Sequence, residues 1–346
     1  MLRLVDFESL PDSGRFYAGN AGRKVGVRWE ERNWILKFPG PTGKLQGSVP
    51  SYTTAPISEF LGSHVYESLG VPVHETVLGI RDGKVVCACR DFVPSGSRLI
   101  DFHDLKNSLS DEEPGFVESA STGSGVVLAD VRAAIRRIPV LASISGVRER
   151  FWDMFVTDAF IRNIDRNNSN WGILSNDSGE ISLAPVYGNG NSFNNKRTAL
   201  GIEKRLSSPD LIRQDALDVK LCYTTDKGKP IAPLKYIGSG QDDECTAALF
   251  RFMNRFDIKR CCELVDSIPD QSLGVTVLPE RFHEYHKAVL TYRYEHVFVP
   301  MWKELRGDCS ISLPFPLTMS QQLPAPAVMN PSILEVPNTE SGLNLN

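Results

Sequence analysis

Hydrophobic and polar residues alternate in short extended runs over the first part of the chain. Residues 16–38 contain two such runs around a glycine-bearing turn and a third run after a polar turn. Runs of this length, bounded by turn residues, predict three antiparallel strands. Residues 71–79 and 84–93 predict two more strands, joined by a turn at Arg81-Asp82-Gly83. The five strands would form one small sheet.

Between these groups of strands, apolar residues recur at helical spacing after Pro56, at Ile57, Phe60, Leu61, His64 and Val65. Downstream, the same periodicity predicts helices at 126–137, 148–162, 242–256 and 279–305. Residues 108–125 are rich in Ser, Gly and acidic residues, which predicts an exposed loop. The pattern thus predicts a small β-rich part with one helix, followed by a larger helical part.

The overall composition is that of an ordinary soluble protein. The chain has 346 residues, 41% hydrophobic and 23% charged, with a formal net charge of −4. Its length suits one large two-lobed domain or two ordinary domains. This balance of charge does not indicate a general nucleic-acid-binding surface.

The lack of a recognisable targeting signal and the pattern of the cysteines favour a reduced, cytoplasmic environment. The N-terminal residues lack an uninterrupted apolar region, and no stretch approaches the roughly 20 apolar residues that span a bilayer. The seven cysteines are odd in number and scattered. Cys87 and Cys89 have the spacing of half a metal site, but without a second cluster we interpret them as buried strand cysteines. We expect a cytoplasmic protein without membrane contact, and leave export by a non-classical route open.

A polar loop between residues 161 and 174 carries the clearest chemical motif. Asp165 precedes Asn170 by five positions, between an apolar helical approach and a strand-like segment. In the catalytic loop of kinases this spacing joins the Asp that accepts the proton of the substrate hydroxyl to an Asn that helps to hold magnesium. Taken alone the spacing is weak, because Asp and Asn also stabilise ordinary turns. The order of the neighbouring elements strengthens the interpretation.

Lys37 and Glu59 are candidates for a phosphate-binding pair. Lys37 stands between Leu36 and Phe38, so alternation leaves open whether it is solvated or points into a cleft. Glu59 lies in the first turn of the predicted helix, where it either complements the helix dipole or orients Lys37.

In their order, the motifs of this chain resemble those of the HipA-like serine/threonine protein kinases, and most closely the short CtkA-type members. The resemblance covers about residues 10–305 and rests on segments 17–22, 34–39, 57–64, 69–76, 89–92 and 163–172. It implies a bilobal, protein-kinase-like α+β fold, with a small antiparallel β lobe carrying one helix and a larger, mainly helical lobe. We expect the lobes at 1–93 and 94–308, and a disordered tail at 309–346 because its composition is rich in Pro, Ser, Thr and Asn.

The resemblance also implies ATP and Mg²⁺ as cofactors and a role for each candidate residue. Lys37 would contact the phosphates, Glu59 would orient Lys37, Asp165 would be the catalytic base and Asn170 would bind metal. The nucleotide would lie against the glycine turn and the hinge, which comprise Gly19, Asn20, Ala21, Gly22, Arg90, Asp91 and Phe92. Such kinases phosphorylate Ser or Thr of a protein, several act as toxins or effectors, and an antitoxin-like or regulatory protein is a candidate partner.

One position departs strongly from the family pattern. The family usually has an Asp after an Ala-Pro-x-aromatic strand, but here residues 184–187 are followed by Gly188. Glycine has no carboxylate, so the expected metal site lacks its strongest ligand. Three explanations are open: an inactivating substitution in a toxic kinase, a natural pseudokinase, or rescue by Asn189 or Asn191. We favour the first two, because an Asn amide is a neutral ligand. A milder departure is Asn167, where the family often has His; we expect it to affect the geometry of the loop.

Two functions of different classes follow. The first is an ATP-dependent serine/threonine protein kinase that is weakened or inactive because of Gly188. The alternative is a pseudokinase that binds a nucleotide or a partner protein as a regulatory module. A small-molecule or lipid kinase uses similar loops and ranks lower only because of the resemblance to protein kinases.

Overall fold

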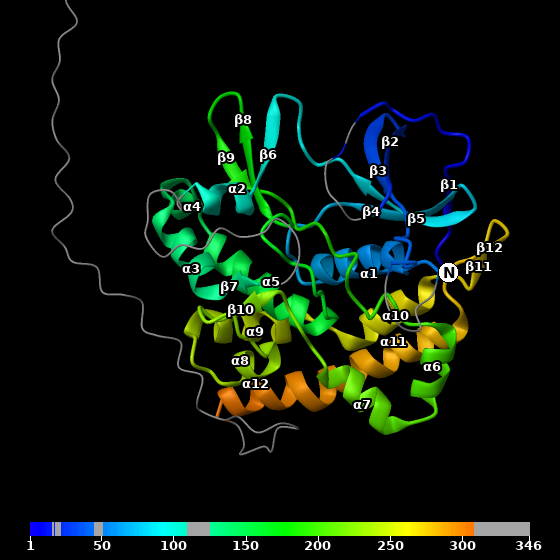
Figure 1. Cartoon of the computed structure of the whole chain (residues 1–346). Helices are drawn as coiled ribbons and strands as arrows, with labels where there is room; N and C mark the ends of the chain where they lie inside the picture. The colour runs from blue at the N-terminus through cyan, green and yellow to red at the C-terminus, as the bar shows by residue number, and fades with distance from the viewer. Residues whose placement is uncertain (16, 18–21, 45–50, 109–124, 308–346) are drawn as a thin grey trace, which may run out of the picture.

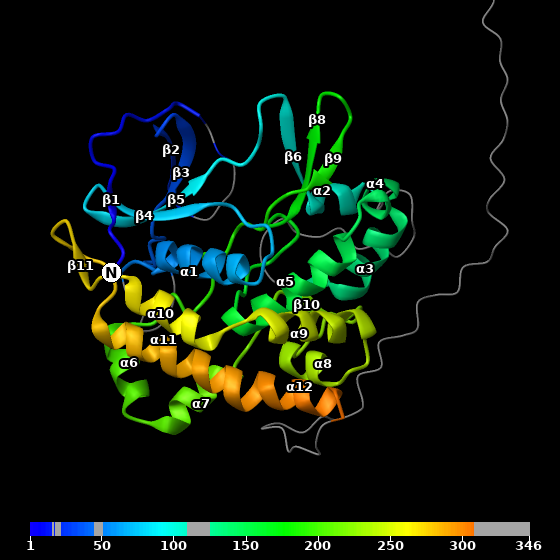
Figure 2. The same cartoon turned by 180° about the vertical axis from the view of Figure 1, so that it is seen from behind.

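A five-stranded sheet and a group of helices lie on opposite sides of helix α1 (Ala55–Ser68), as Figure 1 shows. This computed structural model describes residues 1–15, 17, 22–44, 51–108 and 125–307. Seen from behind in Figure 2, helices α10 (Ile258–Ser267) and α11 (Glu280–Arg293) run below α1, on the side away from the sheet. The predicted α+β architecture, with a small sheet-containing lobe and a larger helical lobe, is confirmed.

The small sheet has the strand order β1-β4-β5-β3-β2. Its strands are β1 (Val5–Asp6), β2 (Lys24–Trp29), β3 (Arg32–Lys37), β4 (Thr76–Arg81) and β5 (Lys84–Arg90). The predictions for β3, β4, β5 and the turn between the last two are confirmed. Asp82 and Gly83 in that turn both have positive φ, as a two-residue hairpin of this kind requires.

The edge of this sheet differs from the prediction. In the range expected to hold the first strand, Tyr17 is the one described residue before Gly22, and it is not in a strand. The fifth strand is instead β1, which pairs in parallel with β4, so the sheet is not wholly antiparallel. A strand of two residues is too short to show alternation, which is why the hydrophobic pattern does not reveal it.

The two faces of the sheet have different environments. Trp34 and Leu36 of β3 are buried in a cluster on the outer face. Lys37 follows the opposite phase of the alternation and lines the cleft between the lobes. Strand register places Lys24 of β2 and Cys87 of β5 directly opposite Lys37, on the cleft face.

Helix α1 is mostly buried and packs against the helical lobe as well as the sheet. Its apolar side chains pack in the same core as those of α5 (Val147–Ile161) in the helical lobe. Its polar residues Ser58, Glu59 and Ser63 are buried as well. All three hydrogen-bond to the segment 188–192, so α1 carries its polar face to the predicted metal turn.

A second, three-stranded antiparallel sheet flanks the predicted catalytic loop. Its strands are β6 (Ser97–Asp101), β8 (Gly172–Asn176) and β9 (Ile181–Leu183). In Figure 1 it stands beside the five-stranded sheet, next to helix α2 (Phe102–Asn107). Strand β8 matches the strand-like segment expected after the polar loop, whereas β6 is not among the predicted strands. Two shorter sheets pair β7 (Val126–Val127) with β10 (Tyr223–Thr224), and β11 (Gln271–Ser272) with β12 (Val275–Thr276).

The four long helices are confirmed, with ends shifted by one or two residues. They are α3 (Leu128–Arg137), α5, α9 (Asp243–Arg255) and α11, which continues through the π-helical turn η1 (Tyr294–Phe298) into α12 (Val299–Leu305). The remaining helices are α4 (Pro139–Ser143), α6 (Ala199–Leu206), α7 (Pro209–Leu217) and α8 (Pro233–Gly238). Among the described residues, no helix combines the length and apolar character needed to cross a membrane.

Most of the predicted loop at 108–125 and the whole of the predicted tail lie outside the described residues. The division of the chain at residue 93 stays a prediction.

Candidate active site

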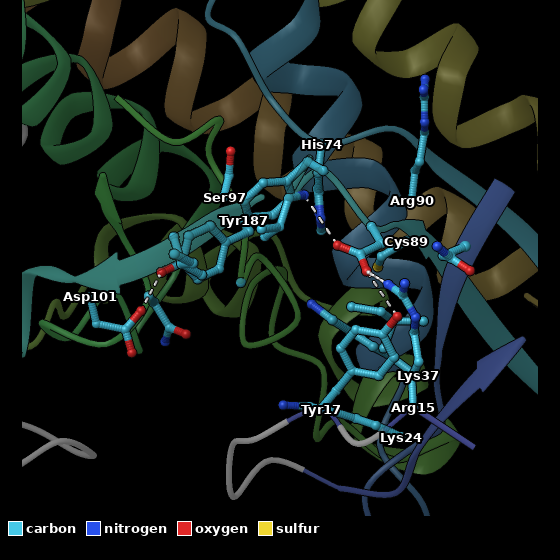
Figure 3. Close-up of a pocket in the computed structure, with 18 of the residues that line it drawn as sticks. Arg15, Tyr17, Lys24, Lys37, His74, Cys89, Arg90, Ser97, Asp101 and Tyr187 are labelled. Carbon is cyan, nitrogen blue, oxygen red and sulfur yellow. Dashed lines mark hydrogen bonds and ion pairs between the residues drawn. The ribbon is translucent and has the colours of Figure 1, made fainter. Parts of the chain in front are cut away.

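Lys37, which is labelled in Figure 3, lines the cleft and meets Glu59. The Lys37 Nζ atom lies 2.9 Å from Glu59 Oε1, and the Glu59 side chain is only 3% exposed. Burial alone would raise the pKa of Glu59, but Lys37 and the neighbouring His74 outweigh it and hold this pKa well below its usual value. The carboxylate is therefore charged at neutral pH and forms an ion pair with the lysine.

The catalytic loop begins where α5 ends and presents Asp165 to the same cleft. Arg162, directly after the helix, has a left-handed conformation (φ 58°) that turns the chain away from the helix axis. Each carboxylate oxygen of Asp165 accepts a hydrogen bond of 2.8 Å, one from the Asn167 amide and one from the Asn191 amide. These two amides fix the orientation of the carboxylate. The bond from Asn167 explains physically why this residue is expected to affect the geometry of the loop.

Arg166 ties the catalytic loop to the turn at Gly188. Its fully buried guanidinium pairs with Asp158 of α5, with Nε 2.8 Å from Oδ2. It also donates to the backbone carbonyl of Asn170 at 3.0 Å and to that of Tyr187. Burial opposes the charge, but Asp158 outweighs it and raises the pKa of Arg166. One cation thus holds three segments together without facing the cleft.

The two predicted metal positions, Asn170 and Gly188, face each other directly. A Cβ atom at position 188 would lie 2.8 Å from Asn170 Oδ1, and Gly188 has φ +76°, which disfavours residues with a side chain. The Asn170 amide nitrogen donates to the backbone carbonyl of Asp165. The Gly188 N–H donates to Glu59 Oε1 at 3.1 Å, so the turn is tied to the lysine–glutamate pair even without a carboxylate.

Only one of the two Asn residues considered for rescue reaches the cleft. Asn189 is buried, its amide oxygen accepts from Arg166, and its nitrogen donates to Ser63 at 3.1 Å. It therefore points away from the space between Asp165 and Lys37. Asn191 lines the cleft, with its amide nitrogen on Asp165.

The chain is 30% identical over 273 residues to the serine/threonine-protein kinase CtkA of Helicobacter pylori, an alignment that covers 78% of this chain and 80% of the relative. The crystal structure of the Helicobacter pylori proinflammatory kinase CtkA matches with a TM-score of 0.76 at 26% identity, over 88% of this chain and 99% of that chain. HipA of the Shewanella oneidensis toxin–antitoxin system, solved with HipB and operator DNA, matches with a TM-score of 0.49 at 13% identity, over 89% of this chain and 70% of that one. No protein-family model matches.

The chain is a serine/threonine protein kinase of the CtkA type. The expected family is confirmed, whereas the roles assigned to individual residues stay predictions.

The kinase has a cavity of about 960 Å³ that runs from the hinge to Lys37. Of the predicted nucleotide-binding residues, Lys37, Arg90, Asp91 and Phe92 line it. The backbone N–H groups of Arg90 and Asp91 already donate to the carbonyls of Glu75 and Asn33, both at 2.9 Å. An adenine ring would therefore have to use other groups of the hinge, and the aromatic face of Phe92 is one of them.

The glycine turn is only partly described. Gly19, Asn20 and Ala21 lie outside the described residues. Gly22 has φ +74° and lines a second cavity, next to the first. Tyr17 lines the first cavity and donates from its hydroxyl to Asp91 of the hinge at 2.9 Å.

His74 and Cys89 lie next to Glu59, and neither is among the site residues predicted from the sequence. His74 Nε2 lies 3.0 Å from Glu59 Oε1, and Glu59, His74 and Cys89 offer three potential metal-ligand atoms within 4.8 Å of one another. The ammonium of Lys37 already bonds to that carboxylate, so a metal cation there would meet repulsion at close range. Cys87 and Cys89 are both buried and free, in agreement with their interpretation as strand cysteines.

Asp101 at the end of β6 is another cleft residue that sequence reasoning missed. Its carboxylate accepts a hydrogen bond of 2.9 Å from the Tyr187 hydroxyl, and burial raises its pKa. Its place in the cleft follows from the pairing of β6 with β8, in which Asp101 is opposite Gly172. No signal in the local sequence predicts this pairing.

Proposed function

We propose that this kinase transfers the γ-phosphoryl group of Mg²⁺-ATP to a Ser or Thr hydroxyl of a protein substrate, slowly because Gly188 lacks a carboxylate. The observation that carries the proposal is the convergence of Lys37, Glu59, Asp165 and Asn170 on one cleft, with Lys37 and Glu59 in direct contact.

Asp165 would accept the proton of the substrate hydroxyl as the oxygen attacks phosphorus. The two amides on its carboxylate keep it turned to the cleft, while each oxygen retains further acceptor capacity. Lys37, held by Glu59, would contact the nucleotide phosphates as a fixed positive charge.

The side chains present fit a magnesium ion only in part. Mg²⁺ prefers oxygen ligands and is usually held by one or two carboxylates together with the substrate phosphates. Asn170 Oδ1 and the Asp165 carboxylate are the oxygens that would hold it here, with Asn191 as a further neutral candidate. When bound, the ion would neutralise phosphate charge. Without a carboxylate at 188 we expect a rate lower by about a hundredfold or more.

A regulatory pseudokinase is the second candidate, favoured by the same position. Gly188 has a left-handed backbone and lies close to Asn170, both of which favour a residue without a side chain. The hydrogen bond from its N–H to Glu59 keeps the framework of the site intact without a carboxylate at this position. In this case the cleft would bind a nucleotide, or the surface a partner such as an antitoxin-like protein, without phosphoryl transfer.

Transfer of phosphate from radiolabelled ATP tests the choice. The chain would be compared with Gly188→Asp, with Gly188→Ala as a control that adds a Cβ without a carboxylate, and with Asp165→Asn in the Gly188→Asp background. We expect labelling of a generic Ser/Thr protein to rise in Gly188→Asp alone and to be lost again in the double variant. If no version labels while ATP still raises the melting temperature, the pseudokinase stands; equal labelling by the chain and Gly188→Asp would contradict the role given to position 188.

A further inference from the structure

A second cavity of about 830 Å³ continues the cleft beyond the catalytic loop. It shares Lys24, Lys37, Asp165, Asn170 and Gly188 with the nucleotide cavity, and then leads away from the hinge. Its outer wall consists of residues from 40–44, 53–59 and 190–196. Asp165 lines both cavities. With a nucleotide on the hinge side, the second cavity would be the route by which a phosphoacceptor hydroxyl reaches Asp165.

The described lining of the second cavity is strongly basic. Its cations are Arg23, Lys24, Lys37, Lys44 and Lys196, and its carboxylates are Glu59 and Asp165. Lys37 neutralises Glu59, and Asp165 is held by two amides for its predicted role. The chain as a whole has a net charge of −4, so this excess of positive charge is a local feature and not a result of composition.

The cations divide into an inner and an outer group. Lys24 and Lys37 are register partners on the cleft face of the sheet, where the nucleotide phosphates would lie. The outer group, Arg23, Lys44 and Lys196, lies farther along the same cavity. Arg23 packs on the Phe38 ring, with its guanidinium carbon 4.3 Å from the ring centroid, and also pairs with the carboxylate of Asp82. Lys44 and Lys196 therefore supply most of the unbalanced positive charge of the outer group. Arg23 and Lys44 belong to the small lobe and Lys196 follows the metal turn, so the outer cations border the cavity from both lobes.

We propose that this outer group, Arg23, Lys44 and Lys196, selects protein substrates whose Ser or Thr is flanked by acidic side chains. The inference rests on the proposed function, because it assumes that the second cavity receives the substrate chain. Opposite charges on the two surfaces favour encounter and register, and a basic flank would be repelled from the same three cations. The effect is electrostatic, so salt weakens it over a Debye length of about 10 Å at 0.1 M.

Direct peptide binding tests the proposal without requiring phosphoryl transfer. Fluorescent peptides with one central Ser would be flanked by Glu, by Gln or by Lys, and their affinities measured by anisotropy at low and high salt. We expect the Glu-flanked peptide to bind about tenfold more tightly than the Gln-flanked one at low salt, with the advantage shrinking as salt rises. A phosphoserine-flanked peptide would be compared with the Glu-flanked peptide. Whichever of these two peptides binds more tightly shows whether the anionic flank comes from earlier phosphorylation or from acidic residues.

Charge reversal separates recognition from a general loss of structure. The double variant Lys44→Glu/Lys196→Glu should reverse the preference, so that the Lys-flanked peptide binds more tightly than the Glu-flanked one. Lys227→Glu/Lys259→Glu makes the same change in net charge at exposed positions that line neither cavity and should leave the preference unchanged. Equal affinity for all flanks in the unmodified chain, or the same shift in both double variants, would overturn the proposal.

The outcomes also separate this inference from the proposed function. If the acidic preference and its reversal are found but Gly188→Asp transfers no phosphate, the proposed function fails and the basic surface stands as a docking site for acidic segments. If Gly188→Asp phosphorylates acidic and neutral peptides equally well, the proposed function stands and the inference fails.

Discussion

Two neighbouring parts of the cleft differ in how completely their charged groups are matched. Around Lys37 and Asp165, each charge has fixed partners: Lys37 has Glu59, and Asp165 has the amides of Asn167 and Asn191. At Gly188, the expected carboxylate is missing and only a backbone N–H faces Glu59. The contrast shows that the framework of a kinase site does not depend on the carboxylate that would bind its metal, because α1 and Arg166 position the turn through other atoms.

The largest effect on this framework is expected from Arg166→Met. The substitution leaves Asp158 buried with a charge that Tyr66 and Asn163 only partly satisfy. Breaking a buried ion pair by removing one partner typically lowers the free energy of unfolding by about 3–5 kcal/mol. Denaturant unfolding measures this loss, and the exposed Arg260→Met serves as control. A loss below about 1 kcal/mol would show that Arg166 is not the link between the catalytic loop and the turn.

Lys37→Met should lower the melting temperature in a pH-dependent way, because it removes the partner of Glu59. The pKa of Glu59 is depressed in the folded protein, so its charge contributes stability above the usual carboxyl pKa of 4.5, and this contribution is lost as pH falls toward the folded value. Without Lys37, the burial that raises this pKa gains weight, and the charged carboxylate becomes unfavourable at neutral pH. We expect the melting temperature of Lys37→Met to fall below that of the unmodified chain at pH 7, with the difference shrinking below pH 4.5.

Glu59→Gln in the Lys37→Met background is the matched control for that dependence. It removes the titrating carboxylate, so the change in melting temperature relative to the unmodified chain should be similar at pH 7 and below pH 4.5. If the difference between Lys37→Met and the unmodified chain is the same at both pH values, Glu59 is not the group responsible.

A smaller effect on the free energy of unfolding is expected from Gly188→Ala. The left-handed backbone and the approach of the new Cβ to Asn170 should together lower the free energy of unfolding by about 1–2 kcal/mol. Gly188→Asp should lose less than Gly188→Ala, since Asp tolerates this conformation better. Thermal unfolding compares the two, and a neutral Gly188→Ala would show that Asn170 moves aside without strain.

The smallest effect is expected from Tyr187→Phe. It removes the hydroxyl that donates to Asp101 and should lower the free energy of unfolding by about 0.5–1.5 kcal/mol. Nucleotide affinity should change little, because the ring and its packing against Phe92, with centroids 5.5 Å apart, are retained. A large loss of nucleotide affinity on titration would instead place the hydroxyl in direct contact with the ligand.

The candidate site was partly predictable because its main residues lie in local motifs. Asp165 and Asn170 occupy one loop, and Lys37 and Glu59 each follow a clear strand or helix pattern. His74, Cys89, Lys24 and Asp101 were not recognised as parts of the site. They reach it through strand register or through the parallel contact of Val73 with Val186. None of these long-range pairings leaves a periodic signal in the sequence.

The α+β order of strands and helices, the candidate groups for phosphoryl transfer and the missing carboxylate at position 188 can all be read from the sequence. The way in which these groups are paired depends on the three-dimensional fold. In the fold, α1 packs against the predicted metal turn, Asn189 bonds to Arg166, and Arg23, Lys44 and Lys196 line one cavity. Periodicity indicates which face of an element is buried, but packing between segments far apart in the chain selects the partner on that face.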